Sequence, residues 1–346
     1  MQGRTKILHV VGSLNQTQQL YQIAREMPEC DHYFTQFFGE GAVWKWMAEG
    51  GILDWTILGT GSAFRREQSD FLDQTGVRYD YRGSFYRDEY AVVFLCTDIM
   101  VPKRFSNAKL VFVQEGMTDP LNAQAKIIHK LGLPRWLAGN TALNGCSNQC
   151  DLYFAASEGY ARYFESMGTD PSKIHVTGIP NFDHAESFLT NDFPHRDYVL
   201  VCTSDIREVG GKENRIAFLK NCKRIAEGRR IMVKLHPNEK TDRARDEVKR
   251  VFGEDALVLQ KGNTGHMIAN CAELITQYSS VVYIGMALEK RVHSLFPMDL
   301  LKERMPVQNG GTSAARIAER VRALLKRVEP SCFPETVSSF RRATAS

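Results

Sequence analysis

Short apolar runs alternate with polar, helix-forming segments along most of the chain, which predicts an α/β protein with mainly parallel strands. The strand-like runs are rich in β-branched and large apolar residues and lack strict alternation, as buried parallel strands do. In the first half they cover 6–11, 32–38, 91–96, 108–114, 151–156 and 174–177. Helices are predicted between them, at 18–26, 42–49, 123–131 and 158–167.

The same alternation continues beyond residues 190–196, a segment with Asn, Asp and Pro that we interpret as a linker. Strands are predicted there at 198–203, 231–235, 256–260 and 274–277, and an amphipathic helix at 313–328. We therefore predict two Rossmann-like domains, residues 1–190 and 191–328, followed by a tail at 329–346. Two such domains would leave a cleft between them, where ligands are commonly bound.

Two segments of the first half have weaker patterns. Residues 55–58 are predicted to form a strand. Residues 59–87 are rich in Gly, Arg, Asp and Tyr, and we expect them to be a long mobile segment that faces a partner or substrate.

Composition excludes several classes of function. The 346 residues include 43% hydrophobic and 24% charged residues with a net charge of +4, which is typical of a globular protein and too small to predict nucleic-acid binding. Cys146 and Cys150 are more widely spaced than in a zinc knuckle and have no second pair, so no metal or other cofactor is expected. Without a signal peptide or a membrane-spanning run, we expect a cytoplasmic protein; any membrane contact would be peripheral, at the inner face.

Three short motifs follow predicted strands: Gln114-Glu115-Gly116, His236-Pro237 and Ser279-Ser280. Pro237 cannot continue a ladder, so it ends its strand and leaves His236 at the strand tip. Open α/β sheets bind their ligands at this edge. These motifs are therefore the candidate catalytic and binding residues.

The chemistry of these side chains suits transfer from a phosphate-linked donor. Glu115 could accept a proton from a hydroxyl that Gly116 lets approach closely, although a carboxylate at this position can also cap a loop or pair with arginine. His236 could donate to a phosphate, or be a structural histidine. The Ser279 and Ser280 hydroxyls, with the first amides of the next helix, could bind an anion, or simply cap that helix.

Other residues at strand ends are weaker candidates for binding the substrate. Lys234 alternates with His236 and could assist it, although a solvated edge charge is the more ordinary role. The remaining candidates are Gly12, Ser13, Thr203 and Ser204, the last two beside a Gly210-Gly211 loop that could also be a hinge.

The order of the three motifs resembles that of bacterial GT-B glycosyltransferases, the sialyltransferases and Kdo transferases, which carry an acidic-acidic-Gly motif, a His-Pro motif and a Ser/Thr pair. Gln114 replaces the first acid, which leaves Glu115 as the base. The segment 176–183, Val-Thr-Gly-Ile-Pro-Asn-Phe-Asp, is also similar to the Kdo transferase segment that leads into the second domain.

This resemblance implies a GT-B fold, with two Rossmann-like domains whose mainly parallel sheets face each other across a cleft. It implies a metal-independent glycosyltransferase that uses a nucleotide-sugar donor, with a CMP-linked acidic sugar preferred, and a glycan or glycolipid acceptor. Glu115 would be the base, and His236, Ser279 and Ser280 would hold the donor phosphate, with Pro237 fixing the histidine.

Two related families are alternatives. UDP-N-acetylglucosamine 2-epimerases share a His-Pro-Asn segment, here His236-Pro237-Asn238, but have a glycine-containing acidic helix start where this chain has Ser279-Ser280-Val281-Val282. CDP-glycerol transferases also have a His-Pro strand end, with histidine where this chain has Glu115. A binding module on the same fold that has lost catalysis is a third, non-enzymatic possibility.

Overall fold

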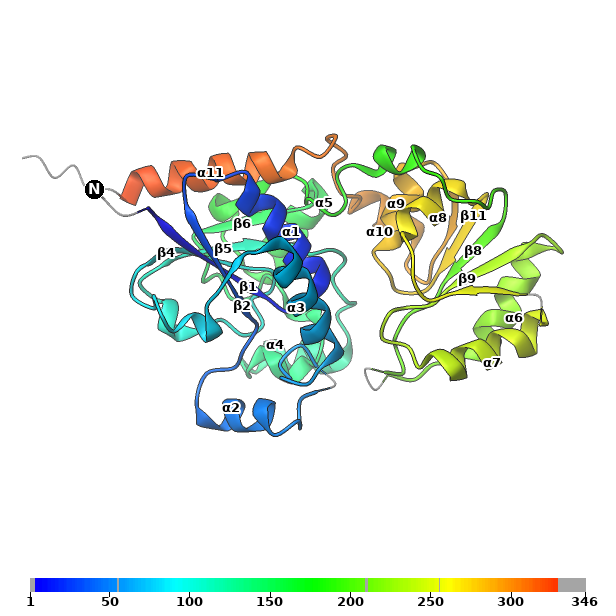
Figure 1. The fold of residues 1–346 in the computed structure, drawn as a ribbon, viewed down its shortest axis with the longest axis horizontal. Coiled ribbons are helices and arrows are strands. Elements are labelled where there is room, and N and C mark those ends of the chain that lie inside the picture. The colour runs from blue at the N-terminus through cyan, green and yellow to red at the C-terminus, as the bar shows by residue number, and fades with distance from the viewer. Residues whose placement is uncertain (1–3, 55, 209–210, 255, 329–346) are drawn as a thin grey trace, which may run out of the picture.

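The computed structural model describes residues 4–328 except 55, 209–210 and 255, and contains two α/β units (Figure 1). Each unit is built on a parallel sheet, which confirms the predicted fold class. The strands of the first sheet are β1 (Lys6–Val11), β2 (Asp31–Gln36), β3 (Arg78–Tyr79), β4 (Tyr90–Leu95), β5 (Lys109–Val113), β6 (Leu152–Ala155) and β7 (Ile174–Val176). Those of the second are β8 (Val199–Cys202), β9 (Ile231–Lys234), β10 (Leu257–Leu259), β11 (Glu273–Thr276) and β12 (Arg291–His293).

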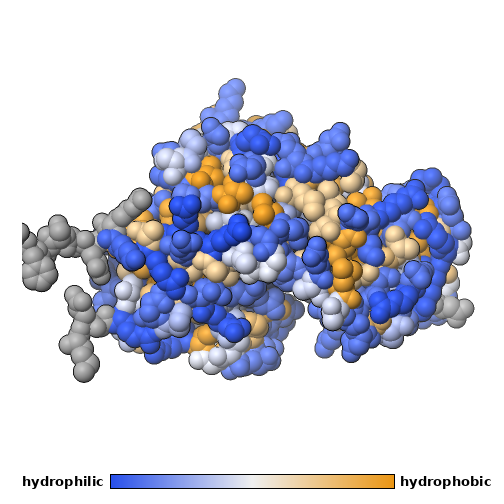
Figure 2. Space-filling model, turned by 90° about the horizontal axis from the view of Figure 1, so that it is seen from above, coloured by the Kyte–Doolittle hydropathy of each residue, from blue (hydrophilic) through white to orange (hydrophobic). Residues whose placement is uncertain are grey.

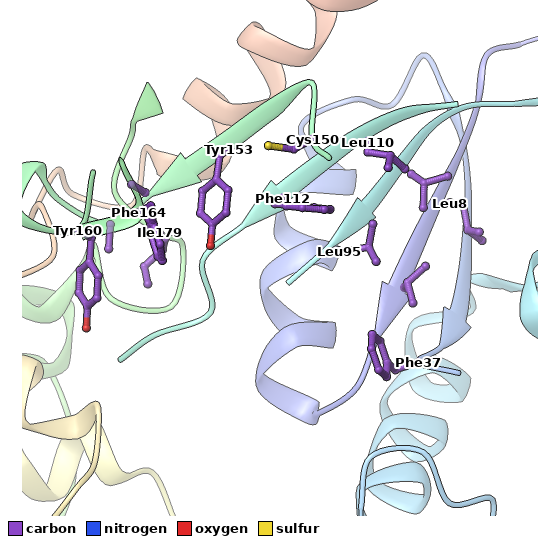
Figure 3. Close-up of a cluster of buried hydrophobic side chains, with 14 of the residues drawn as sticks. Leu8, Phe37, Leu95, Leu110, Phe112, Cys150, Tyr153, Tyr160, Phe164 and Ile179 are labelled. Atoms are coloured by element: carbon purple, nitrogen blue, oxygen red, sulfur yellow. The ribbon is translucent and has the colours of Figure 1, made fainter. Parts of the chain in front are cut away.

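In the described part of the chain, the first sheet has the order β3-β2-β1-β4-β5-β6-β7. Its helices are α1 (Leu14–Arg25), α2 (Ala42–Glu49), α3 (Ala63–Thr75), α4 (Ala123–Lys130) and α5 (Glu158–Met167). Short 3-10 helices include η1 (Tyr81–Gly83), η2 (Lys103–Phe105) and η3 (Arg135–Ala138). Alternate strand residues pack into separate apolar clusters, as expected for a sheet covered on both faces. One cluster, which contains Leu8, Leu95 and Phe112, extends to Tyr160 and Phe164 of α5 (Figure 3).

The second sheet has the order β10-β9-β8-β11-β12 within the described residues. Its helices are α6 (Arg215–Ala226), α7 (Thr241–Phe252), α8 (Thr264–Asn270), α9 (Val281–Ala287) and α10 (Met298–Glu303). The strand order reverses between β8 and β11: β9 and β10 extend the sheet on one side, and β11 and β12 extend it on the other. Because all strands are parallel, the loops after β8, β9 and β11 lie at the same edge. Ligands bind at this topological position in open α/β sheets.

The last described helix, α11 (Ser313–Val328), returns to the first unit. Ala314, Ile317 and Val321 are buried in the same cluster as Ile7 and Leu20. Figure 1 shows α11 lying along the first unit and beside α1. The sequence pattern had grouped this helix with the second domain; the boundary at residue 190 stays a prediction, and the predicted tail, 329–346, lies outside the described residues.

Two predictions in the first half are wrong. Residues 56–58 form a turn instead of a strand, and Trp55 lies outside the described residues. The segment 59–87, expected to be mobile, contains α3, β3 and η1. Phe71 and Leu72 of α3 pack against the core, and Asp80 is fully buried, with its carboxylate accepting from Tyr90 Oη at 2.6 Å. These few buried contacts order a segment whose composition is mostly polar.

Candidate functional site

The predicted site residues follow strands at the carboxyl edges of the two sheets. Ser13 follows β1, and Glu115 follows β5. In the second sheet, Thr203 follows β8, His236 follows β9, and Ser280 follows β11. Ser13 contacts Glu115 in the first unit, and Thr203 contacts the His236 backbone in the second, whereas Ser280 contacts the first unit.

Glu115 is half-buried, and among the described residues its carboxylate is bonded by side chains alone. Ser13 Oγ donates to one carboxylate oxygen at 2.8 Å, and Gln16 Nε2 donates to the other at 2.6 Å. Gln16 is in turn fixed by the Gly12 backbone N–H, which donates to its Oε1 at 2.7 Å. Burial raises the pKa of Glu115, and the hydrogen bonds from Gln16 and Ser13 oppose that rise. A carboxylate with a raised pKa is a stronger proton acceptor than an ordinary glutamate.

Gln16 was missed by sequence reasoning. It lies within the first turn of α1, three residues after the N-cap Ser13, whose Oγ accepts from Gln16 N at 3.2 Å. Capping therefore places the Gln16 side chain on the same side as Ser13. Gly12 is tightly surrounded, since an added Cβ would lie 2.8 Å from Ile57 Cδ1.

Ser280 joins the two units. Its Oγ accepts from the Met117 backbone N–H at 2.9 Å, next to Glu115 and Gly116. Ser280 occupies the N-cap position of α9 without making a side-chain cap, whereas Ser279 Oγ is 3.5 Å from Val281 N. The amides of Val282 and Tyr283 already bond the Ser279 and Ser280 carbonyls. Two of the amides expected to be free for an anion are therefore engaged within this turn.

His236 is partly exposed at the edge of the second sheet, with 34% of its side chain accessible. Its Nδ1 accepts from Asn238 N at 3.3 Å and lies 3.6 Å from Asp205 Oδ2. An Nδ1 that accepts from an amide has its lone pair there, so the neutral ring carries its proton on Nε2. Among the residues that the structure describes, no partner bonds Nε2, which leaves it as a donor toward a ligand.

A buried polar network fixes the backbone of His236. Glu239 Oε2 accepts from His236 N at 2.9 Å and also bonds Thr203 Oγ1. Glu239 Oε1 lies 2.6 Å from Arg215 Nη1, and both side chains are essentially inaccessible. Arg215 Nη2 also donates to the Ser204 carbonyl at 2.8 Å. The pairing of Glu239 with Arg215 was not predicted, because residues 24 positions apart give no local signal of it.

Three predicted binding residues are already engaged inside the protein. Thr203 is buried and bonded to Glu239. Ser204 is buried, with its Oγ 3.4 Å from the Tyr278 carbonyl. Lys234 is neither a solvated edge charge nor close to a free surface: its Nζ donates to the Leu235 and Gln260 carbonyls, each at 2.9 Å, and burial lowers its pKa.

A cavity of about 360 Å³ lies beside the Ser280 link and has walls from both units. The first unit contributes Asp119 and Tyr163, and the second contributes Tyr278 and Arg304. The Arg304 guanidinium lies 4.3 Å from the centroid of the Tyr163 ring, and no ion pair neutralises it among the described residues. The cavity thus combines a cation, a carboxylate and aromatic rings.

The described residues contain no group of three or more His, Cys, Asp or Glu side chains placed to hold a metal ion. Cys146 and Cys150 are free thiols, and burial raises the pKa of each to about 12.

No protein-family model matches this sequence, and no curated protein is similar enough in sequence to show a family. Solved structures share its fold. The Staphylococcus aureus MnaA–UDP co-structure aligns with a TM-score of 0.61 and 12% identity, over 95% of this chain and 100% of that one. A UDP-GlcNAc 2-epimerase from Neisseria meningitidis, bound to UDP-GlcNAc, aligns with a TM-score of 0.55 and 11% identity, over 93% and 100% of the two chains.

The wall teichoic acid polymerase TagF aligns with a TM-score of 0.55 and 12% identity, over 94% of this chain and 89% of that one. At these identities the similarity shows the fold alone: two parallel-sheet α/β units of the GT-B type. These structures do not show the resemblance to sialyltransferases and Kdo transferases that the sequence motifs suggested.

Proposed function

We propose that this chain is an enzyme acting on a nucleotide-activated sugar or polyol, and that it transfers this unit from a nucleoside-diphosphate-linked donor to an acceptor hydroxyl. The observation that carries the proposal is Glu115. It is a carboxylate with a raised pKa, held only by Ser13 and Gln16, at the point where the first unit contacts the second.

Glu115 takes the proton of the acceptor hydroxyl as the acceptor oxygen attacks the donor. The bond from the transferred unit to the nucleotide phosphate breaks, and the departing phosphate oxygen keeps the electron pair. The Nε2–H of His236 donates to that phosphate, which gains negative charge in the transition state. Glu239 and Thr203 support this role by holding the His236 backbone.

The cavity with Arg304 supports an acceptor or sugar site between the two units. Aromatic rings such as Tyr278 can pack against a sugar ring, while Asp119 can accept hydroxyl protons. Arg304 suits a negatively charged group.

A nucleoside diphosphate is a better supported donor group than the CMP-linked acidic sugar expected from the sequence. Solved structures of the same fold were obtained with UDP, with UDP-GlcNAc and, for TagF, with CDPG. None of these compounds is a CMP-linked sugar.

Epimerisation of a UDP-sugar at C2 is the second candidate function. It is favoured by the similarity of the whole chain to several UDP-GlcNAc 2-epimerases. This reaction needs no acceptor, and Glu115 would exchange a proton with the sugar itself.

One experiment tests the class and separates the two reactions. Thermal unfolding is measured with UDP, CDP, CMP and GDP, since a bound nucleotide raises Tm by mass action. The protein is then incubated with UDP-GlcNAc alone and followed by NMR. A Tm shift with UDP or CDP supports the nucleotide site, and a new sugar isomer identifies an epimerase. If none of the four nucleotides shifts Tm, the proposed class is wrong.

A further inference from the structure

The helix α2 is apolar in composition and yet has no buried residue. Val43 and Trp46 are 67% and 66% exposed. Figure 1 shows α2 projecting from the first unit on the side opposite to α11. A helix with this composition normally buries one face, so this surface requires an explanation.

A second exposed apolar segment runs from α4 to η3, and it adjoins α2. The Trp44 and Trp136 rings touch edge to face, with 5.2 Å between centroids. Of the 14 large hydrophobic side chains that are exposed in the described part of the chain, eight lie within 42–52 and 123–138, so the clustering is not a general property of the surface. This α2/α4 ridge consists of Val43, Trp46, Ile52, Ile127, Leu131, Leu133, Trp136 and Leu137. Hydrophilic residues predominate on the α11 side of the molecule, around several apolar patches (Figure 2).

Basic side chains lie beside the apolar residues of the α2/α4 ridge. A cavity of about 410 Å³ at the start of α2 is lined by Lys45, Arg82 and Arg104. Arg104 pairs with Glu40 at 3.0 Å, and Lys45 lies 3.9 Å from Glu49, so these three cations face two carboxylates and keep an excess positive charge.

Lys126 and Lys130 are exposed on α4 itself and extend the cationic character along the ridge. No salt bridge joins either of them to a carboxylate in the described residues. The apolar side chains of the ridge are therefore bordered by basic groups along much of its length.

From these observations we infer that the α2/α4 ridge docks on the surface of a bilayer that contains anionic phospholipids. Tryptophan and aliphatic side chains enter the interfacial layer, and the basic cavity and the lysines of α4 contact lipid phosphates. The excess of basic side chains complements anionic lipid phosphates, and exposed tryptophan is typical of residues at a membrane–water interface. No helix in the described residues is long and apolar enough to cross a membrane, so the contact is peripheral.

The ridge and Glu115 lie at the same edge of the first sheet. The segments that hold α2 and α4 follow β2 and β5 at the carboxyl edge of the first sheet, the same edge as Glu115. A bilayer on the ridge would therefore lie on the side of the molecule where the candidate catalytic carboxylate is found.

The test is flotation of the full chain with vesicles of phosphatidylcholine alone and of phosphatidylcholine with phosphatidylglycerol, without nucleotide. We expect binding to the anionic vesicles only. Trp46→Ser should weaken it on the order of tenfold, because an interfacial anchor is lost. Lys126→Gln with Lys130→Gln should also weaken it at low salt, and its difference from the wild type should shrink as added salt screens the charges. Leu189→Ser and Lys220→Gln are matched controls on exposed positions away from the ridge, and melting curves check folding.

Two outcomes would overturn the inference. One is the absence of binding to anionic vesicles by the folded wild-type chain. The other is a concentration-dependent dimer, seen by light scattering, that Trp46→Ser dissociates, because the ridge would then be covered by a second copy. Neither outcome bears on nucleotide binding, so the proposed function is tested separately.

Discussion

The Ser280 hydroxyl oxygen accepts from the Met117 backbone N–H at 2.9 Å, and it would lie 2.7 Å from a Cβ added to Gly116. Ser280 belongs to the second unit, and Met117 follows the strand that delivers Glu115 in the first. The carboxyl edges of the two sheets therefore touch beside the candidate base. The absence of a side chain at Gly116 permits this contact.

Gly116→Ala should push the two units apart at this point. We expect a loss of about 1–3 kcal/mol in the free energy of unfolding, which is typical of an overpacked site, and a larger loss of turnover because Glu115 moves away from its substrate. Denaturant unfolding and steady-state kinetics measure the two effects. In Gly116→Ala with Ser280→Ala the clashing oxygen is gone, so the double variant should lose less stability than the sum of the single variants. Additive losses would show that Gly116 and Ser280 are not in contact.

Glu115→Gln should remove catalysis and preserve folding. Glutamine keeps the shape of the side chain and can still accept from Ser13, but it cannot take a proton. Turnover should fall by about 10²–10⁴-fold, the usual contribution of a general base. In the wild type, the rate should rise with pH through the raised pKa of Glu115, and this acidic limb should be absent from the residual activity of the variant. A variant with wild-type turnover would show that Glu115 is not the base.

Glu115→Gln should also change how the thermal stability of the protein depends on pH. Burial raises the pKa of Glu115 in the folded protein, so the folded state binds this proton more tightly than the unfolded chain does. The contribution of Glu115 to stability is therefore fully present below its unfolded pKa and is lost as pH rises through the folded pKa. The Tm of Glu115→Gln relative to that of the wild type should therefore rise between acidic and neutral pH. Tm measured for both proteins across this range checks the prediction, and a Tm difference that stays constant or falls would contradict it.

The sheets could be predicted from the sequence because buried parallel strands have a local pattern: apolar runs bounded by Gly, Pro and polar residues. It also located His236 and Glu115 at strand ends, since Pro237 and Gly116 mark where those strands stop. Their surroundings could not be predicted in the same way. Gln16 reaches Glu115 across 99 positions, and that contact depends on the packing of α1 against the sheet.

The same limit explains the errors at Lys234 and at residues 59–87. Alternation along β9 places the side chain of Lys234 on one face of the sheet, but the neighbouring β10 supplies the Gln260 carbonyl that holds it. The polar composition of 59–87 hides the few contacts that order it, among them the buried Asp80 carboxylate. In both cases a long-range partner, absent from any local pattern, determines the outcome.

Arg215 and Glu239 form a buried ion pair beneath His236, with 1% and 0% of their side chains accessible. Glu239→Gln removes the negative charge and leaves Arg215 buried with only Glu213 as an ionic partner. We expect a loss of up to about 3–5 kcal/mol in the free energy of unfolding, the cost of breaking such a pair. Denaturant unfolding measures it, and Glu254→Gln is the control, because Glu254 pairs with Lys249 at the exposed surface and should cost less than about 1 kcal/mol. Equal losses in the two variants would show that the buried pair does not stabilise this edge of the sheet.

His236→Ala tests the donor side of the proposed reaction. The Nδ1 of His236 accepts from Asn238, so its Nε2–H is the group available to a nucleotide phosphate. A hydrogen bond to a leaving phosphate strengthens as charge develops, so its loss should lower turnover by on the order of a hundredfold or more, with a smaller effect on nucleotide affinity.

His236→Gln is the informative companion, because its side-chain amide can donate from a position near that of Nε2. We expect it to recover part of the turnover lost in His236→Ala. Both variants should melt near the wild-type temperature, since the side chain is partly exposed and the backbone N–H to Glu239 is retained. Steady-state kinetics, with nucleotide binding followed by thermal shift, separate turnover from affinity. If both folded variants turn over normally, His236 has a structural role, and the leaving-group step must depend on another residue.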